Sequence, residues 1–70
     1  MQNERLTNTL RLHRARLGIT QEELAERIGV SRKTINTIER ERFVPSTVLA
    51  LKLSRALGVP VEEIFRLEPQ

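Results

Sequence analysis

Apolar residues recur along the chain at spacings of three and four positions, which gather side chains on one face of an α-helix. Leu24, Ala25 and Ile28 form one such stripe, and Ile35 and Ile38 form a second. The third and longest stripe consists of Leu49, Ala50, Leu53, Ala56 and Leu57. Because an amphipathic helix buries its apolar stripe, the pattern predicts an all-α fold in which these faces share one core. The only sheet it indicates is a short β-ribbon, formed by the segments "RLT" and "FRL" near the two ends.

Glycine and hydroxyl residues mark where these helices would end and begin. Three glycines follow the apolar segments, namely Gly18, Gly29 and Gly58, and glycine readily adopts the left-handed conformation that ends many helices. Three hydroxyl residues stand where the next helix needs an N-cap, namely Thr20, Ser31 and Ser46. Thr20 and Glu23 also have the spacing of a capping box. We expect helices near residues 8–17, 20–28, 31–41, 46–57 and 60–66.

The second and third predicted helices are joined by only two residues, so the third must turn sharply across the second. This connection needs a small residue where the helices approach, which Ala25 supplies, and a glycine at the turn, which is Gly29. It also needs apolar anchors on the later helix, for which Ile35 and Ile38 are suited. Because all four occur together, we predict a helix-turn-helix unit over about residues 20–41.

A polar stripe lies opposite the two isoleucines of the third predicted helix. At about 100° per residue it consists of Lys33, Asn36, Thr37 and Arg40. Ser31 and Arg32 flank this stripe at the N-terminal end, which enters first when a recognition helix docks in a major groove. The stripe contains no carboxylate, whereas an ordinary solvated face mixes both signs of charge. We therefore interpret it as a DNA-contacting face, and a solvated face is the alternative.

Composition narrows the possible functions. A chain of 70 residues allows one domain, whose core leaves roughly 3–5 kcal/mol of net stability. Residues 1–58 hold eleven Lys and Arg against six Glu, so the basic character lies in the first four fifths of the chain. A basic domain favours a polyanionic partner.

Several classes of site are excluded. The sequence has no cysteine and one histidine, so we expect no metal and no cofactor, and a reducing cytoplasmic location. It has no apolar run of roughly 18 residues and no signal peptide, which predicts no membrane partner. An enzyme would need a nucleophile or an acid/base pair, but the chain has no Cys, Asp or Tyr. His13 is expected to be a solvated helix residue, and the protein is not expected to be an enzyme.

Residues 18–65 resemble the Cro/repressor-type (Xre-like) helix-turn-helix family, through the elements "TQEELA", "GVSRKTI", "IE" and "LGVPVEEIF". The pattern is most similar to compact stand-alone repressors such as the cytolysin repressor, which are dimers that bind operator DNA and whose chain ends form a β-ribbon. The resemblance implies one five-helix repressor-like domain over residues 1–70. It implies a sequence-specific transcriptional regulator, a repressor, that is nucleoid-associated when bound to DNA. The alternative is an antitoxin or protein-binding adaptor on the same scaffold.

The resemblance also implies roles for single residues. Those expected to reach base edges are Arg32, Lys33, Asn36 and Thr37. Those expected to hold the DNA backbone are Gln21, Ser31, Arg40 and Arg42. Two positions depart from the pattern of many relatives. Glu41 replaces a glycine and is expected to extend the third helix by part of a turn, and Val44 replaces an asparagine that touches the DNA backbone.

Two charged residues lie on apolar stripes. Arg14 is in line with Leu10 and Leu17 on the first predicted helix, and Glu39 lies beside Ile35 and Ile38 on the third. A buried charge is tolerable only when it is paired. We therefore predict that Arg14 and Glu39 form a structural ion pair, as the family resemblance also implies.

The C-terminal segment holds more apolar residues than a five-helix core can hide, so residues 59–68 are predicted to mediate a homodimer. Both phenylalanines, Phe43 and Phe65, are expected in the core. The expected interface residues are Val61, Ile64 and Leu67. Such a dimer would bind an inverted-repeat operator in double-stranded DNA. The alternative is a monomer with a few exposed apolar residues.

Overall fold

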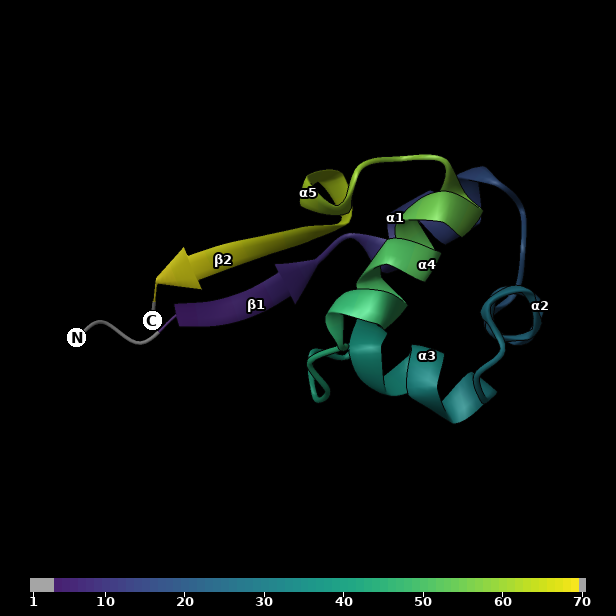
Figure 1. Cartoon of the computed structure of the whole chain (residues 1–70), viewed down its shortest axis with the longest axis horizontal. Coiled ribbons are helices and arrows are strands. Elements are labelled where there is room, and N and C mark those ends of the chain that lie inside the picture. The colour runs from purple at the N-terminus through teal and green to yellow at the C-terminus, as the bar shows by residue number, and fades with distance from the viewer. Residues whose placement is uncertain (1–3, 70) are drawn as a thin grey trace.

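The computed structural model describes residues 4–69, so residues 1–3 and 70 of the predicted single domain lie outside the described residues. The elements in chain order are β1 (Glu4–Asn8), α1 (Leu10–Arg16), α2 (Gln21–Ile28), α3 (Arg32–Glu39), α4 (Thr47–Leu57), α5 (Val61–Ile64) and β2 (Phe65–Pro69). All five predicted helices are present, each slightly shorter than expected. The predicted terminal ribbon is also present, because β1 and β2 pair antiparallel with Leu6 opposite Leu67. The ribbon extends away from the helices (Figure 1).

Local side-chain contacts set the helix ends. The Thr20 hydroxyl accepts from the Glu23 N–H at 3.0 Å, and the Thr20 N–H donates to Glu23 Oε1 at 2.8 Å, which completes the predicted capping box. The hydrogen bonds from Thr20 lower the pKa of Glu23, because they favour the ionised carboxylate. Ser31 and Ser46 cap α3 and α4 in the same way. Gly29 follows α2 with φ +74°, a value that side chains with a Cβ rarely adopt.

Eleven buried apolar side chains form one core, contributed by all five helices, the α1–α2 loop and the start of β2. They are Leu10, Ile19, Leu24, Ala25, Ile28, Ile35, Ile38, Leu53, Leu57, Ile64 and Phe65. Leu6 and Val61 are partly buried and pack against this core. The apolar stripes predicted from the spacing therefore do face one another.

Three expectations about burial were wrong. Phe43 is 47% exposed, because it lies in the loop between α3 and α4 and not over the core. His13 is buried rather than solvated, and the carbonyl oxygen of Glu63 in α5 lies 3.3 Å from His13 Nε2. Ile64 is fully buried within its own domain and cannot contact a second copy, whereas Leu67 is 62% exposed.

The predicted contact between Arg14 and Glu39 is present. Arg14 Nε donates to Glu39 Oε2 at 2.8 Å and its Nη2 to Oε1 at 3.3 Å, while Nη1 donates to the Ile19 carbonyl oxygen at 3.0 Å. The Glu39 side chain is only 2% exposed. Asn8 makes a second cross-link, because its Nδ2 donates to the Ile38 carbonyl oxygen at 2.8 Å. These polar contacts fix α3 relative to α1 and to the end of β1.

Replacing Arg14 by methionine is expected to lower the free energy of unfolding by on the order of 3–5 kcal/mol, because the Glu39 carboxylate would stay buried without its cation. Urea unfolding measures this change. The matched control is Arg11→Met, since Arg11 lies 3.8 Å from the same carboxylate but its side chain is 78% exposed. That control should cost no more than about 1 kcal/mol. Equal losses in the two variants would contradict a special role for the buried pair.

Candidate nucleic-acid interface

The orientation of α3 decides which of its side chains reach solvent. Gly29, Val30 and the N-cap Ser31 join α2 to α3, and the Val30 N–H donates back to the Ala25 carbonyl oxygen at 3.0 Å, which reverses the chain tightly. Ile35 and Ile38 then hold α3 against the core. The predicted helix-turn-helix geometry is therefore present, with α3 packed against α2 (Figure 1).

The predicted polar stripe of α3 lies away from the core. Lys33 and Arg40 are exposed, and Asn36 and Thr37 are half-buried. Arg32 is exposed at the N-terminal end of the helix. The only carboxylate within α3 is Glu39, which faces the core. The solvent side of α3 therefore offers cations, an amide and a hydroxyl residue.

Two hydroxyl groups at this face already form hydrogen bonds within the protein. The Ser31 oxygen accepts from the Thr34 N–H at 3.2 Å and so caps α3. The Thr37 hydroxyl lies 3.0 Å from the carbonyl oxygens of both Lys33 and Thr34, which accept its proton. Thr37 can therefore offer its methyl group to a thymine methyl and its oxygen only as an acceptor.

The end of α3 differs from the expectation. Glu41 was expected to extend the helix, but it adopts a left-handed conformation with φ +60°. The Glu41 and Arg42 N–H groups donate to the Ile38 and Thr37 carbonyl oxygens, each at 2.9 Å, which is the Schellman arrangement that ends helices. In a longer helix the Ile38 carbonyl would accept from Arg42, but here it accepts from Asn8 and Glu41. The turn places Arg40 and Arg42 at the surface beside α3.

Gln21 was predicted at the DNA side from the family pattern, and it begins α2. The structure adds contacts that the sequence analysis missed. Gln21 Nε2 donates to Glu39 Oε1 at 3.0 Å and to Asn36 Oδ1 at 3.4 Å. Nothing in the sequence spacing pointed to these pairs, because they join residues 15 and 18 positions apart on two different helices.

Two other kinds of site are absent from the described part of the chain. Within residues 4–69, no group of three or more His, Cys, Asp or Glu side chains is arranged to bind a metal ion. Among the helices of the same residues, none combines the length and the apolar character needed to cross a membrane.

Comparison with known proteins agrees with this geometry. A helix-turn-helix family model matches residues 10–64. The chain belongs to the Cro/C1-type (Xre) helix-turn-helix family of transcriptional regulators. Members of this family are DNA-binding proteins and not enzymes. The finer likeness to the cytolysin repressor remains a prediction.

Three similar proteins show how much of this chain the similarity covers. An HTH-type transcriptional regulator of Methanothermobacter thermautotrophicus is 53% identical over 60 residues, which are 84% of this chain and 87% of the relative. YgzD of Bacillus subtilis, also described as an HTH-type transcriptional regulator, is 42% identical over 65 residues. These are 93% of this chain and 98% of YgzD. The crystal structure of the P22 c2 repressor with a synthetic operator is similar with a TM-score of 0.73 and 34% identity, over 76% of this chain and 80% of that protein.

The left-handed Glu41 leads to a stability prediction for the regulator. Glu41→Gly is expected to raise the free energy of unfolding by about 0.5–1 kcal/mol, because glycine adopts positive φ without the clash of a Cβ atom. The contact of Glu41 with Arg5 should contribute little, because its charged atoms are 3.8 Å apart and Arg5 is 60% exposed.

The matched control for this prediction is Glu41→Ala, which removes the carboxylate and keeps the Cβ atom. It should leave the free energy of unfolding nearly unchanged in the same urea titration. If the alanine variant gained as much stability as the glycine variant, backbone strain at this position would not be the cause.

Proposed function

We propose that this regulator is a repressor that binds an inverted-repeat operator as a homodimer and inserts α3 into the major groove. The observation that carries the proposal is the outer face of α3, which offers cationic and amide groups while its single carboxylate is buried. The similarity to the P22 c2 repressor, which was solved in complex with a synthetic operator, supports operator binding by this chain.

The proposed base contacts follow from the donors and acceptors on this face. Arg32 and Lys33 are exposed donors, which suit the O6 and N7 acceptors of guanine. Asn36 carries both a donor and an acceptor, which suit N7 and N6 of adenine. The methyl group of Thr37 suits the methyl group of thymine.

The proposed phosphate contacts lie around this face. Arg40 and Arg42 are exposed at the C-terminal end of α3 and are the cations best placed for the DNA backbone. Ser31 lies at the opposite end of the helix and Gln21 at the start of α2. Only cationic side chains displace counterions from DNA. Among these four residues, Arg40 and Arg42 therefore contribute most of the salt dependence of binding.

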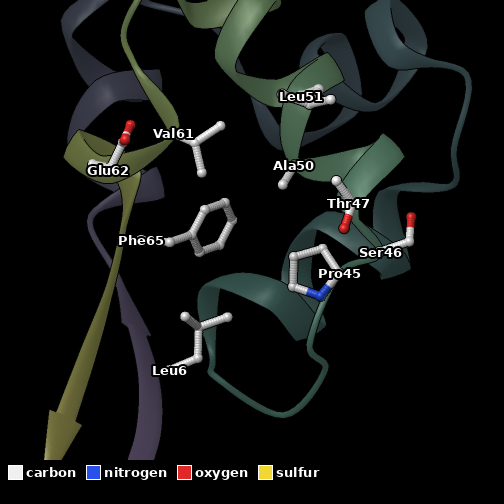
Figure 2. Close-up of a pocket in the computed structure, with 9 residues that line it drawn as sticks. All are labelled: Leu6, Pro45, Ser46, Thr47, Ala50, Leu51, Val61, Glu62 and Phe65. Atoms are coloured by element: carbon white, nitrogen blue, oxygen red, sulfur yellow. The ribbon is translucent and has the colours of Figure 1, made fainter.

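A second copy of the chain is proposed to bind on the side of the ribbon and α5. An open groove of about 510 Å³ lies there between β1, α4 and α5, and its apolar lining includes Leu6, Leu51, Val61 and Phe65 (Figure 2). Leu67 is exposed on the neighbouring strand. None of the groove's lining residues comes from α2 or α3, so a partner bound there leaves the reading helix uncovered.

The test of DNA reading contrasts two single substitutions on an operator selected from random duplexes. Asn36→Ala should relax the preference at one base pair per half-site, by about 1–3 kcal/mol. Arg40→Ala should weaken binding to all sequences alike. The parent dimer should show a slope of log K against log salt of about −4 to −7, and Arg40→Ala should flatten it by roughly 2, because each dimer loses two cations.

Fluorescence anisotropy at several salt concentrations gives both quantities. If neither substitution changed affinity or preference, the assignment of α3 to the groove would be wrong. Binding that did not depend on salt would instead favour the protein-binding adaptor.

The homodimer is tested with a charge on the proposed interface. Leu67→Glu should convert a dimer at micromolar concentration into a monomer in sedimentation and reduce binding to the full inverted repeat, because a carboxylate would be buried between the subunits. The matched control is Leu12→Glu, since Leu12 is 49% exposed on α1 and should leave the dimer intact. A parent protein that is monomeric and binds one half-site with full affinity would overturn the homodimer.

A further inference from the structure

Gln21 connects the buried core with the DNA-facing side of α3. Its Nε2 donates to the carboxylate of Glu39 at 3.0 Å and to Asn36 Oδ1 at 3.4 Å. Its Oε1 accepts from the guanidinium of Arg32 at 3.5 Å. Gln21 therefore stands between a core carboxylate and two of the side chains assigned to base edges.

The number of donors on Gln21 limits what else its side chain can do. A glutamine amide has two N–H donors, and here both have acceptors within the protein, on Glu39 and Asn36. A phosphate oxygen only accepts hydrogen bonds, so the side chain could bind one only by losing one of these partners. The backbone N–H of Gln21 lies in the first turn of α2, where a helix provides no acceptor, and it suits a phosphate without any rearrangement.

The contact with Glu39 determines the orientation of Gln21. Arg14 holds the Glu39 carboxylate from the other side at 2.8 Å, and the Glu39 side chain is 2% exposed, so the acceptor is fixed in place. A hydrogen bond to an ionised group is roughly twice as strong as one between neutral groups. Glu39 therefore sets the orientation of the Gln21 amide, and the longer contacts of Gln21 with Asn36 and Arg32 form in that orientation.

Orientation matters most for Asn36. To read adenine, an asparagine must donate from Nδ2 to N7 and accept at Oδ1 from N6. A 180° rotation of the amide exchanges donor and acceptor and destroys this match. Gln21 Nε2 faces Asn36 Oδ1, and in the rotated amide it would instead face another NH₂ group, which cannot accept. The contact with Gln21 therefore favours one of the two amide orientations.

We propose that Gln21 is a positioning residue for base recognition, which takes its orientation from the buried carboxylate of Glu39 and imposes one amide orientation on Asn36. The inference rests on the proposed reading of DNA by α3. It assigns the side chain of Gln21 to sequence preference and leaves phosphate contact at this position to the backbone.

A double-mutant cycle on an operator library tests this role. Gln21→Met keeps the length of the side chain without its donors, and it is combined with Asn36→Ala. Gln21→Met should reduce the preference at the base pair read by Asn36 by at least about fivefold, the lower end of the range for one base contact. The double variant should show the preference of Asn36→Ala alone, since Gln21 acts on that base pair through Asn36. Thermal unfolding checks that each variant is folded.

A phosphate role for the Gln21 side chain predicts a different pattern. Gln21→Met would then weaken all library members alike, and its effect would add to that of Asn36→Ala. That result would overturn the positioning role and leave the reading of DNA by α3 standing. A library in which Asn36→Ala changes neither affinity nor preference would overturn both the proposed function and this inference.

Gln21→Glu is a second variant of the same size. It removes the Nε2 donors and places a carboxylate beside Glu39 and Asn36. Under the positioning role it should relax the preference at the same base pair as Gln21→Met does. An unchanged preference in this folded variant would contradict the role of the Nε2 donors.

Discussion

The buried contact between Glu39 and Arg14 is the constraint on which the arrangement of the first three helices depends. A carboxylate that is 2% exposed is unfavourable unless a cation and further donors satisfy it. Arg14 supplies the cation from α1 and also holds the loop before α2 through the Ile19 carbonyl. Apolar packing is non-directional. The ion pair adds direction, and it allows only those positions of α3 that keep the carboxylate paired.

The same carboxylate links the core to the proposed recognition surface. Its Oε1 accepts from Gln21, which contacts Asn36 on the outer half of α3. One short helix thus carries an apolar stripe, a buried anion and a cationic face that exposes no carboxylate. The groove proposed for a second copy is lined by other elements, so the proposed dimer contact and the proposed DNA contact use separate surfaces.

Much of this architecture follows from local rules that operate within a few residues. Thr20 and Ser31 cap helices because a hydroxyl oxygen reaches an N–H three residues later. Gly29 ends α2 because it adopts positive φ without strain. The spacing of Ile35 and Ile38 fixes which side of α3 is buried and hence which side is polar. The pairing of Arg14 with Glu39 could also be predicted, because two charges on apolar stripes need each other.

The sequence by itself therefore determined the five helices, the N-caps of α2, α3 and α4, the faces of α3 and the family. Only the tertiary structure decided which residues those elements meet. His13 is buried where the Glu63 carbonyl of α5 contacts its ring, and Ile64 is unavailable to the proposed dimer interface because it is buried in the core of its own domain. Glu41 adopts a left-handed conformation instead of continuing α3, and Asn8, from a distant strand, donates to the Ile38 carbonyl at this end of the helix. Such contacts depend on packing between segments far apart in the chain, about which periodicity and capping rules carry no information.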